Sequence, residues 1–333
     1  MIETKLTIDH VDLGGKRVLT RLDLNVPIKD GQITDDERIV RAIPTIQKIR
    51  DDGGIAVLCS HLGRPKGERI EKYSLKPVAK KLSELLGTKV TFLPDCIGQE
   101  VEDAVSLGRP GEIFLLENLR FHAGETKNDP VFAAQLSSLG DIFINDAFGT
   151  AHRAHASNVG VSQLMEKAVA GYLMLNELET FGKILANPKR PFISIIGGLK
   201  ISSKTKVIDN LMPKVDKLLL GGGLIFTFYK ALGLNVGKSF VEDEFLHRAA
   251  HIISESEEDA LMNESGVAKV VLPMDVLCAD DLENPTKMEE YPNDGMPDDM
   301  MGLDIGSVTA ESFADMIRSA GTVVMTGPMG VFE

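Results

Sequence analysis

Four arginines and a histidine stand at or just beyond the ends of predicted strands in the first half of the chain. These residues are Arg38, Arg64, Arg120, Arg153 and His61. Guanidinium groups gathered on one edge of a sheet repel one another unless an anion with several oxygens joins them. The pattern therefore predicts a site for a ligand that carries a phosphate and a carboxylate. The alternative is a set of solvated loop charges.

Glycines and two lysines follow the predicted strands of the second half, in segments such as GGLKISSK at 197–204 and GGG at 221–223. Glycine lets a backbone approach phosphates or an adenine ring closely, and a helix N-terminus favours negative charge. Lys200 and Lys204 are four residues apart, so one helical turn places both ammonium groups on one face. Phosphate contacts are predicted here, with two surface lysines as the alternative.

Other motifs are weaker. No GxGxxG follows a strand, and residues 233–239 resemble a P-loop but follow a predicted helix and are one residue short between the glycines. His152 and His155 have no third metal ligand at matching spacing, so a structural role is favoured. Glu117 and Asp146 form a hydrolytic carboxylate pair only if they meet, which the sequence does not show.

Short apolar runs alternate with helical patterns, which predicts parallel sheets with helices on both faces and ligands at the carboxyl ends of the strands. In the first half, Asp23 and Asn25 lie at the carboxyl end of the first predicted strand. Residues 280–304 are acidic and are predicted to be mostly a solvated loop, whose apolar end at 301–306 lines the second site. The predicted strands are 17–24, 55–60, 89–92, 113–116, 141–144, 192–196, 217–220, 268–272 and 322–325, and the predicted helices include 36–50, 76–86 and 226–232.

Residues 171–185 are predicted to form an amphipathic helix that connects the two halves. Met174, Leu178, Phe181 and Leu185 make one apolar stripe, and Pro188 ends the pattern. The change from Arg and His before this helix to Gly and Lys after it favours a connector over an ordinary surface helix.

The totals describe a globular protein of two domains: 333 residues, 43% hydrophobic and 26% charged. A net charge of -13 argues against nucleic acid as a partner. Cys59, Cys96 and Cys278 are far apart and predict reduced thiols in a cytoplasmic protein. The N-terminus resembles no signal peptide, and no apolar run is long enough to cross a membrane.

Eight segments in order resemble the signature segments of the phosphoglycerate kinase family: RLDLNVP, SHLGRP, LLENLRFHAGE, DIFINDAFGTAHRAHASNVG, GGLKISSK, GGGLIFTF, MGLDIG and GPMGVFE. The resemblance implies two Rossmann-like, three-layer α/β domains with parallel sheets: 1–170 for phosphoglycerate, a hinge helix at 171–186, and 187–333 for nucleotide. It implies reversible, direct in-line transfer of a phosphoryl group from 1,3-bisphosphoglycerate to ADP, giving 3-phosphoglycerate and ATP, with Mg2+, in a cytoplasmic monomer.

The resemblance also implies roles for individual residues. Arg38, Lys200 and Lys204 would be catalytic, and Lys204 would also contact nucleotide phosphates. The implied substrate-binding residues are Asp23, Leu24, Asn25, Arg38, His61, Leu62, Gly63, Arg64, Arg120 and Arg153, and the implied nucleotide-binding residues are Lys204, Gly221, Gly222, Gly302 and Glu333. These roles agree with the chemistry of the residues. The attacking oxygen, on the phosphate of ADP or on the carboxylate of 3-phosphoglycerate, is already ionised, so the protein only has to position the reactants and cancel charge on the transferring phosphoryl group.

The sequence departs from the family at a few positions. Leu199 stands where a small residue is usual, Ser203 where an acidic residue is common, and Met325-Thr326 where Trp-Asn is usual. The family continues past GPMGVFE into further strands and a Gly-Gly-Asp segment that holds nucleotide phosphates and Mg2+. We therefore expect an incomplete second domain, with an exposed sheet edge or an apolar patch.

Two other functions remain open from the sequence. One is a different small-molecule kinase or dehydrogenase on a doubly wound fold. The absence of a GxGxxG motif after a strand and of a P-loop counts against this function. The other is a non-catalytic or impaired fragment that holds phosphoglycerate and transfers nothing.

Overall fold

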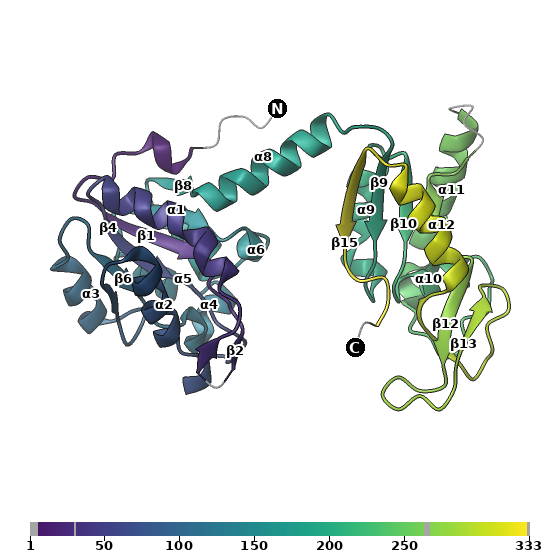
Figure 1. Cartoon of the computed structure of the whole chain (residues 1–333), viewed down its shortest axis with the longest axis horizontal. Helices are drawn as coiled ribbons and strands as arrows, with labels where there is room; N and C mark the ends of the chain where they lie inside the picture. The colour runs from purple at the N-terminus through teal and green to yellow at the C-terminus, as the bar shows by residue number, and fades with distance from the viewer. Residues whose placement is uncertain (1–5, 30, 263–266, 332–333) are drawn as a thin grey trace. The chain divides into compact units, whose positions relative to one another are not determined.

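The computed structural model describes residues 6–29, 31–262 and 267–331. The chain separates into two compact units, Met1–Gly182 and Lys183–Glu333. The division falls within helix α8 (Tyr172–Ala186), which the sequence predicts as the connector at 171–185 (Figure 1). Met174 is buried on this helix, and Phe181 stacks on Phe148 at a ring-centroid distance of 5.9 Å.

A six-stranded parallel sheet forms the centre of the first unit, in the order β5-β6-β4-β1-β7-β8. Most residues of its strands are apolar because both faces are covered. The bounds are β1 Arg17–Leu22, β4 Ile55–Cys59, β5 Val90–Phe92, β6 Ile113–Leu115, β7 Ile142–Asp146 and β8 Ala168–Ala170. Strand β8 was not predicted, because three residues give too short a pattern. A small hairpin, β2 (Ile28–Lys29) with β3 (Gln32–Ile33), follows β1.

Helices cover both faces of this sheet (Figure 1). Successive strand residues point to opposite faces, so Val18 and Leu58 face one layer and Leu19 and Val57 the other. Helices α1 (Glu37–Asp51) and α2 (Lys76–Leu86) pack on the first face, and α3 (Gln99–Ser106) and α5 (Pro130–Ser137) pack on the second. The predicted three-layer arrangement is confirmed.

The second unit has a four-stranded parallel sheet in the order β11-β10-β9-β15. The strands are β9 Phe192–Ile196, β10 Lys217–Leu220, β11 Val270–Val271 and β15 Thr322–Thr326. Its helices are α9 Thr205–Leu211, α10 Ile225–Ala231, α11 Leu246–Met262 and α12 Ser307–Arg318. Helices α9, α10 and α11 share one core with the sheet, and Phe313 of α12 packs on the opposite face.

An antiparallel sheet of three strands, in the order β13-β12-β14, completes the second unit. The strands are β12 Asp275–Ala279, β13 Met288–Pro292 and β14 Met301–Ile305. The prediction of a solvated loop was wrong for residues 288–292. Strand β13 lies at an edge and four of its five residues are exposed, so its acidic composition resembles that of a loop.

Strand β15 pairs with β9 and with no other described strand. Val323 and Met325 on this edge strand are 41% and 57% exposed. The three cysteines are free thiols and are buried, as predicted. None of the described helices is long and apolar enough to cross a bilayer.

Candidate active site

A cavity of about 230 Å³ in the first unit collects most of the residues that the sequence singles out. Arg38, Arg64, Arg120 and Arg153 line it together with His61. The predicted convergence of the four guanidinium groups is therefore confirmed. The remaining lining residues are Asp23, Asn25, Gly63, Gly149 and Thr150.

Neighbouring strands bring these side chains to one edge of the sheet. Strand β1 pairs with β4 on one side and with β7 on the other, and β4 pairs with β6. Because all of these strands are parallel, their carboxyl ends meet at one edge. Arg38 lies in the first turn of α1, Arg120 lies in the 3-10 turn η3 (Leu119–Phe121) after β6, and Arg153 follows the short helix α6 (Phe148–Ala151) after β7.

The positive charges of the four arginines in this cavity exceed the negative charge of its one carboxylate, Asp23. Arg38 Nη1 donates to Oδ2 of Asp23, while Oδ1 of Asp23 is buried without a hydrogen-bond donor. Arg120 Nη1 donates to the carbonyl oxygen of Gly63 at 2.8 Å, and its Nε is buried without an acceptor. Burial and the neighbouring Arg153 lower the pKa of Arg120. Unpaired donors and mutually repelling cations are what an anion with several oxygens would satisfy.

His61 is a neutral member of this site. Burial, reinforced by the charges of Arg21 and Arg120, lowers the pKa of His61 to about 2. Arg21 Nη2 lies 3.0 Å from His61 Nδ1. A guanidinium can only donate, so Nδ1 is the acceptor and Nε2 carries the ring proton. His61 therefore brings a hydrogen-bond donor to the cavity without adding another positive charge.

A buried chain of hydrogen bonds behind His61 was missed by sequence reasoning. Arg21 Nε donates to Ser157 Oγ at 2.9 Å, and Ser157 Oγ donates to Glu125 Oε1 at 2.6 Å. Arg21 and Glu125 are both fully buried, so they balance each other's charge through Ser157. Burial disfavours the ionised form of Glu125, but hydrogen bonds and Arg21 outweigh it and lower the pKa of this carboxyl. An arginine inside the apolar run RVLTRL was the signal that could have identified Arg21.

Several predicted residues lie elsewhere. Leu24 and Leu62 do not line the cavity, because their side chains are buried in the hydrophobic core. Glu117 accepts from Ser74 Oγ and the Leu75 amide, and it has no part in the cavity.

The weaker motifs also have structural explanations. Asp146 accepts from the Met174 amide at the start of α8. His155 is buried beside Glu125, with Nδ1 3.7 Å from Oε1, which agrees with the structural role predicted for it. Residues 233–239 follow helix α10 and not a strand, which agrees with the prediction that they do not form a P-loop.

A second cavity, of about 520 Å³, lies in the second unit. Gly222 and Gly302, two of the residues expected near a nucleotide, line it. Gly222 has φ +69°, and a Cβ there would lie 2.6 Å from the Gly198 nitrogen, so only glycine fits. Apolar side chains make up much of the rest: Leu199, Phe226, Phe240, Leu282, Met301, Leu303, Pro328 and Val331.

The other predicted nucleotide residues lie near this cavity or outside it. Lys200 Nζ lies 5.6 Å from the centroid of the Phe240 ring, which lines the cavity. Lys204 does not line it, and its Nζ donates to Thr326 Oγ1 at 3.3 Å. Gly221 packs against Met329 instead. Glu333 lies outside the described residues.

A cationic cavity in one α/β unit and a glycine-lined, partly apolar cavity in the other are features of a two-domain small-molecule kinase. The model of the family described as phosphoglycerate kinase matches residues 8–333. The phosphoglycerate kinase of Chloroherpeton thalassium is 51% identical over 329 residues, covering 99% of this chain and 81% of the relative. The cytosolic phosphoglycerate kinase of Triticum aestivum is 49% identical, covering 98% and 80%.

Solved structures agree with these sequence relatives. Phosphoglycerate kinase from Coxiella burnetii has a TM-score of 0.76 at 39% identity, covering 99% of this chain and 81% of that one. The enzyme from Pyrococcus horikoshii has a TM-score of 0.77 at 30% identity, covering 98% and 82%. The chain belongs to the phosphoglycerate kinase family. It is a phosphotransferase of glycolysis that moves a phosphoryl group between 1,3-bisphosphoglycerate and ADP, and the relatives favour this activity over the non-catalytic alternative.

Proposed function

We propose that the cavity of the first unit is the binding site for 3-phosphoglycerate and 1,3-bisphosphoglycerate. The observation that carries this proposal is the convergence of four guanidinium groups and a neutral histidine on one cavity that contains a single carboxylate. A phosphate and a carboxylate on one small molecule would neutralise this excess of positive charge. The substrate hydroxyl would donate to Oδ1 of Asp23, the buried acceptor that has no donor of its own.

Within this site, Arg38 is the cation assigned to the transferring phosphoryl group. Its side chain is 53% exposed and is held by Asp23, so it lies at the open side of the cavity. Arg64, Arg120, Arg153 and His61 would hold the phosphate that is not transferred. Leu24 and Leu62 would act only through their backbone, since their side chains belong to the core.

The cavity of the second unit is assigned to ADP and ATP. Its apolar lining suits an adenine ring, and Gly222 and Gly302 allow a close approach of the ligand. Lys204 would turn from Thr326 to the nucleotide phosphates, and Lys200 would contact the phosphoryl group in transit. Gly221 would pack next to this cavity, against Met329. Glu333 would accept a hydrogen bond from the ribose.

The family association with nucleotide implies Mg2+, but the described lining of the second cavity contains no carboxylate. Mg2+ commonly takes one or two protein carboxylates together with phosphate oxygens. The residues that line this cavity therefore do not make a magnesium site.

Transfer itself requires no general base, because the attacking phosphate or carboxylate oxygen is already ionised. The protein contributes in-line positioning and charge cancellation by Arg38, Lys200 and Lys204. Direct transfer also requires the two ligands to meet away from water. We therefore propose a phosphoglycerate domain at 1–170, a hinge helix at 171–186 and a nucleotide domain at 187–333. The enzyme is proposed to act as a cytoplasmic monomer without nucleic-acid or membrane partners.

The proposal is tested by initial rates of phosphoryl transfer from ATP to 3-phosphoglycerate. Arg38→Ala and Lys200→Ala should each lower kcat by about 100-fold or more, since each removes a charge that acts on the transferring group. Lys206→Ala, which removes an exposed lysine from α9, is the matched control and should keep the wild-type rate. Near-normal kcat in Arg38→Ala would refute its assignment.

A further inference from the structure

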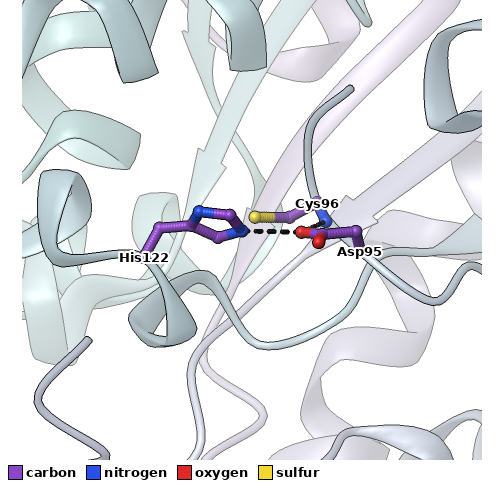
Figure 2. Close-up of side chains that lie close together, drawn as sticks. All are labelled: Asp95, Cys96 and His122. Carbon is purple, nitrogen blue, oxygen red and sulfur yellow. Dashed lines mark hydrogen bonds and ion pairs between the residues drawn. The ribbon is translucent and has the colours of Figure 1, made fainter. Parts of the chain in front are cut away.

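Asp95, Cys96 and His122 form a cluster of three different metal-ligating side chains in the first unit (Figure 2). Asp95 and Cys96 follow β5, and His122 follows the turn η3, so two separate loops contribute. One ligand atom from each residue lies within 4.8 Å of the other two. His122 Nε2 and Asp95 Oδ1 are 2.7 Å apart. None of the three residues lines the substrate cavity.

The surrounding residues hold two of these side chains in place. The Cys96 amide donates to Asp95 Oδ1 at 2.7 Å. Arg69 approaches the other oxygen, Oδ2, at 3.7 Å. The His122 ring packs on Phe132 at a centroid distance of 5.4 Å. Fixed ligands of this kind lower the reorganisation that metal binding requires.

Two of the three ligands are partly exposed to solvent. The side chains of His122 and Asp95 are 31% and 38% exposed, whereas Cys96 is buried. A metal ion held by this buried sulfur and its two partly exposed partners would take water as its fourth ligand. Three protein ligands and a water molecule are a common arrangement for four-coordinate zinc.

We propose that Asp95, Cys96 and His122 bind one Zn2+ ion or a similar divalent transition metal. Thiolate, imidazole and carboxylate are all ligands that Zn2+ accepts, whereas Mg2+ prefers oxygen ligands in an octahedron. This site is therefore distinct from any magnesium carried by the nucleotide.

The ionic surroundings of the cluster are mixed. Partial burial disfavours the ionised form of Asp95, but hydrogen bonds from His122 and the Cys96 amide outweigh it and lower the pKa of this carboxyl. Burial, together with the Asp95 charge, raises the pKa of the Cys96 thiol. The Arg69 charge opposes a cation, and Glu117 lies 3.9 Å from the same guanidinium and partly offsets it. A bound dication would stabilise the Cys96 thiolate directly and release its proton.

The test is a titration of the full chain, free of nucleotide, with Co2+, whose absorption reports its ligands. We expect one Co2+ per chain, with a thiolate-to-cobalt band in the near ultraviolet that Zn2+ abolishes and Mg2+ does not. Cys96→Ala should lose the band, and Cys59→Ala, which removes a buried thiol from the same core cluster, should keep it. Asp95→Asn should weaken binding by about tenfold or more.

His122→Gln gives a second test that leaves the buried thiol intact, in case Cys96→Ala fails to fold. It should also abolish tight Co2+ binding while circular dichroism stays that of the wild type. The proposal is overturned if the folded wild type shows no thiolate band, if the band survives in His122→Gln, or if Cys59→Ala removes it as completely as Cys96→Ala. Binding without the thiolate band would place the metal at other residues and would equally overturn the proposal.

Discussion

Nη2 of Arg21 lies 3.0 Å from Nδ1 of His61, and this contact fixes which ring nitrogen of His61 can donate to a ligand. Because Arg21 can only donate, the proton of His61 is on Nε2. Arg21 is in turn held by Ser157 and Glu125 in the interior of the first unit. The core of this unit thus determines which ring nitrogen of His61 can donate a hydrogen bond in the cavity.

Arg21→Lys should weaken binding of 3-phosphoglycerate by about tenfold or more. A lysine keeps the charge but cannot donate to both Ser157 and His61 from a planar fork, and one charged hydrogen bond is worth about 1.5–3 kcal/mol. Calorimetric titration measures the change. Arg17→Lys is the matched control on the same strand, since Arg17 makes an exposed ion pair with Asp141. Equal affinity in the two variants would contradict the orienting role of Arg21.

Stability should fall as the pH drops below about 6.5, partly because of His61. Its folded-state pKa of about 2 is below the unfolded value of 6.5, so below 6.5 the unfolded chain binds a proton that the folded chain does not. This one group contributes about 1.4 kcal/mol per pH unit in that window. Urea unfolding from about pH 7 to pH 5 should show a shallower decline for His61→Gln, whereas parallel curves would indicate that His61 takes up a proton in the folded state.

Gly63→Ala should destabilise the first unit and weaken substrate binding. Gly63 has φ +61°, and a Cβ there would lie 2.4 Å from Cε1 of Tyr73. Gly87 has the same φ, but nothing lies within 4 Å of its Cβ position, so Gly87→Ala isolates the backbone strain. Gly63→Ala should cost roughly 1–3 kcal/mol more than this control, as overpacking does. Similar losses in chemical denaturation would show that Tyr73 moves aside freely.

Asp146→Asn should raise the free energy of unfolding at neutral pH. Burial raises the pKa of Asp146, although donors such as Thr45 and the Met174 amide partly oppose this. A carboxyl with a raised folded-state pKa loses stability as the pH rises through that pKa, because the unfolded chain ionises more easily. Asparagine keeps the acceptor for Met174 and removes the buried charge. The gain should shrink as the pH falls toward the ordinary carboxyl range, and a loss at neutral pH would show that the charge itself stabilises α8.

The arginine-lined cavity of the first unit could be predicted from the sequence because most of its residues follow apolar strands closely. Once Arg64 and Arg120 are placed after neighbouring parallel strands, their proximity follows from the sheet. Arg21 could not be assigned in this way. Its partner Ser157 is 136 positions away in the sequence, and an arginine inside a strand is recognisable as functional only when its buried neighbours are known.

The second unit was harder to predict. Strand β13 is acidic, and only its pairing with β12 gives it an ordered backbone. The contact of Lys204 with Thr326 likewise depends on β15 pairing with β9, far along the chain. In both cases the tertiary pairing, and not the local composition, determines the structure.

Calorimetric titration with 3-phosphoglycerate tests the central claim most directly, using the wild type, Arg38→Ala and Arg41→Ala. Arg41 lies one turn along the same helix and makes an exposed pair with Glu37, so it is a matched control. The wild type and Arg41→Ala should bind one ligand with similar affinity, and Arg38→Ala should bind about tenfold or more weakly while folded. No saturable binding by the folded wild type, or equal affinity in all three proteins, would contradict the assignment of this cavity to phosphoglycerate.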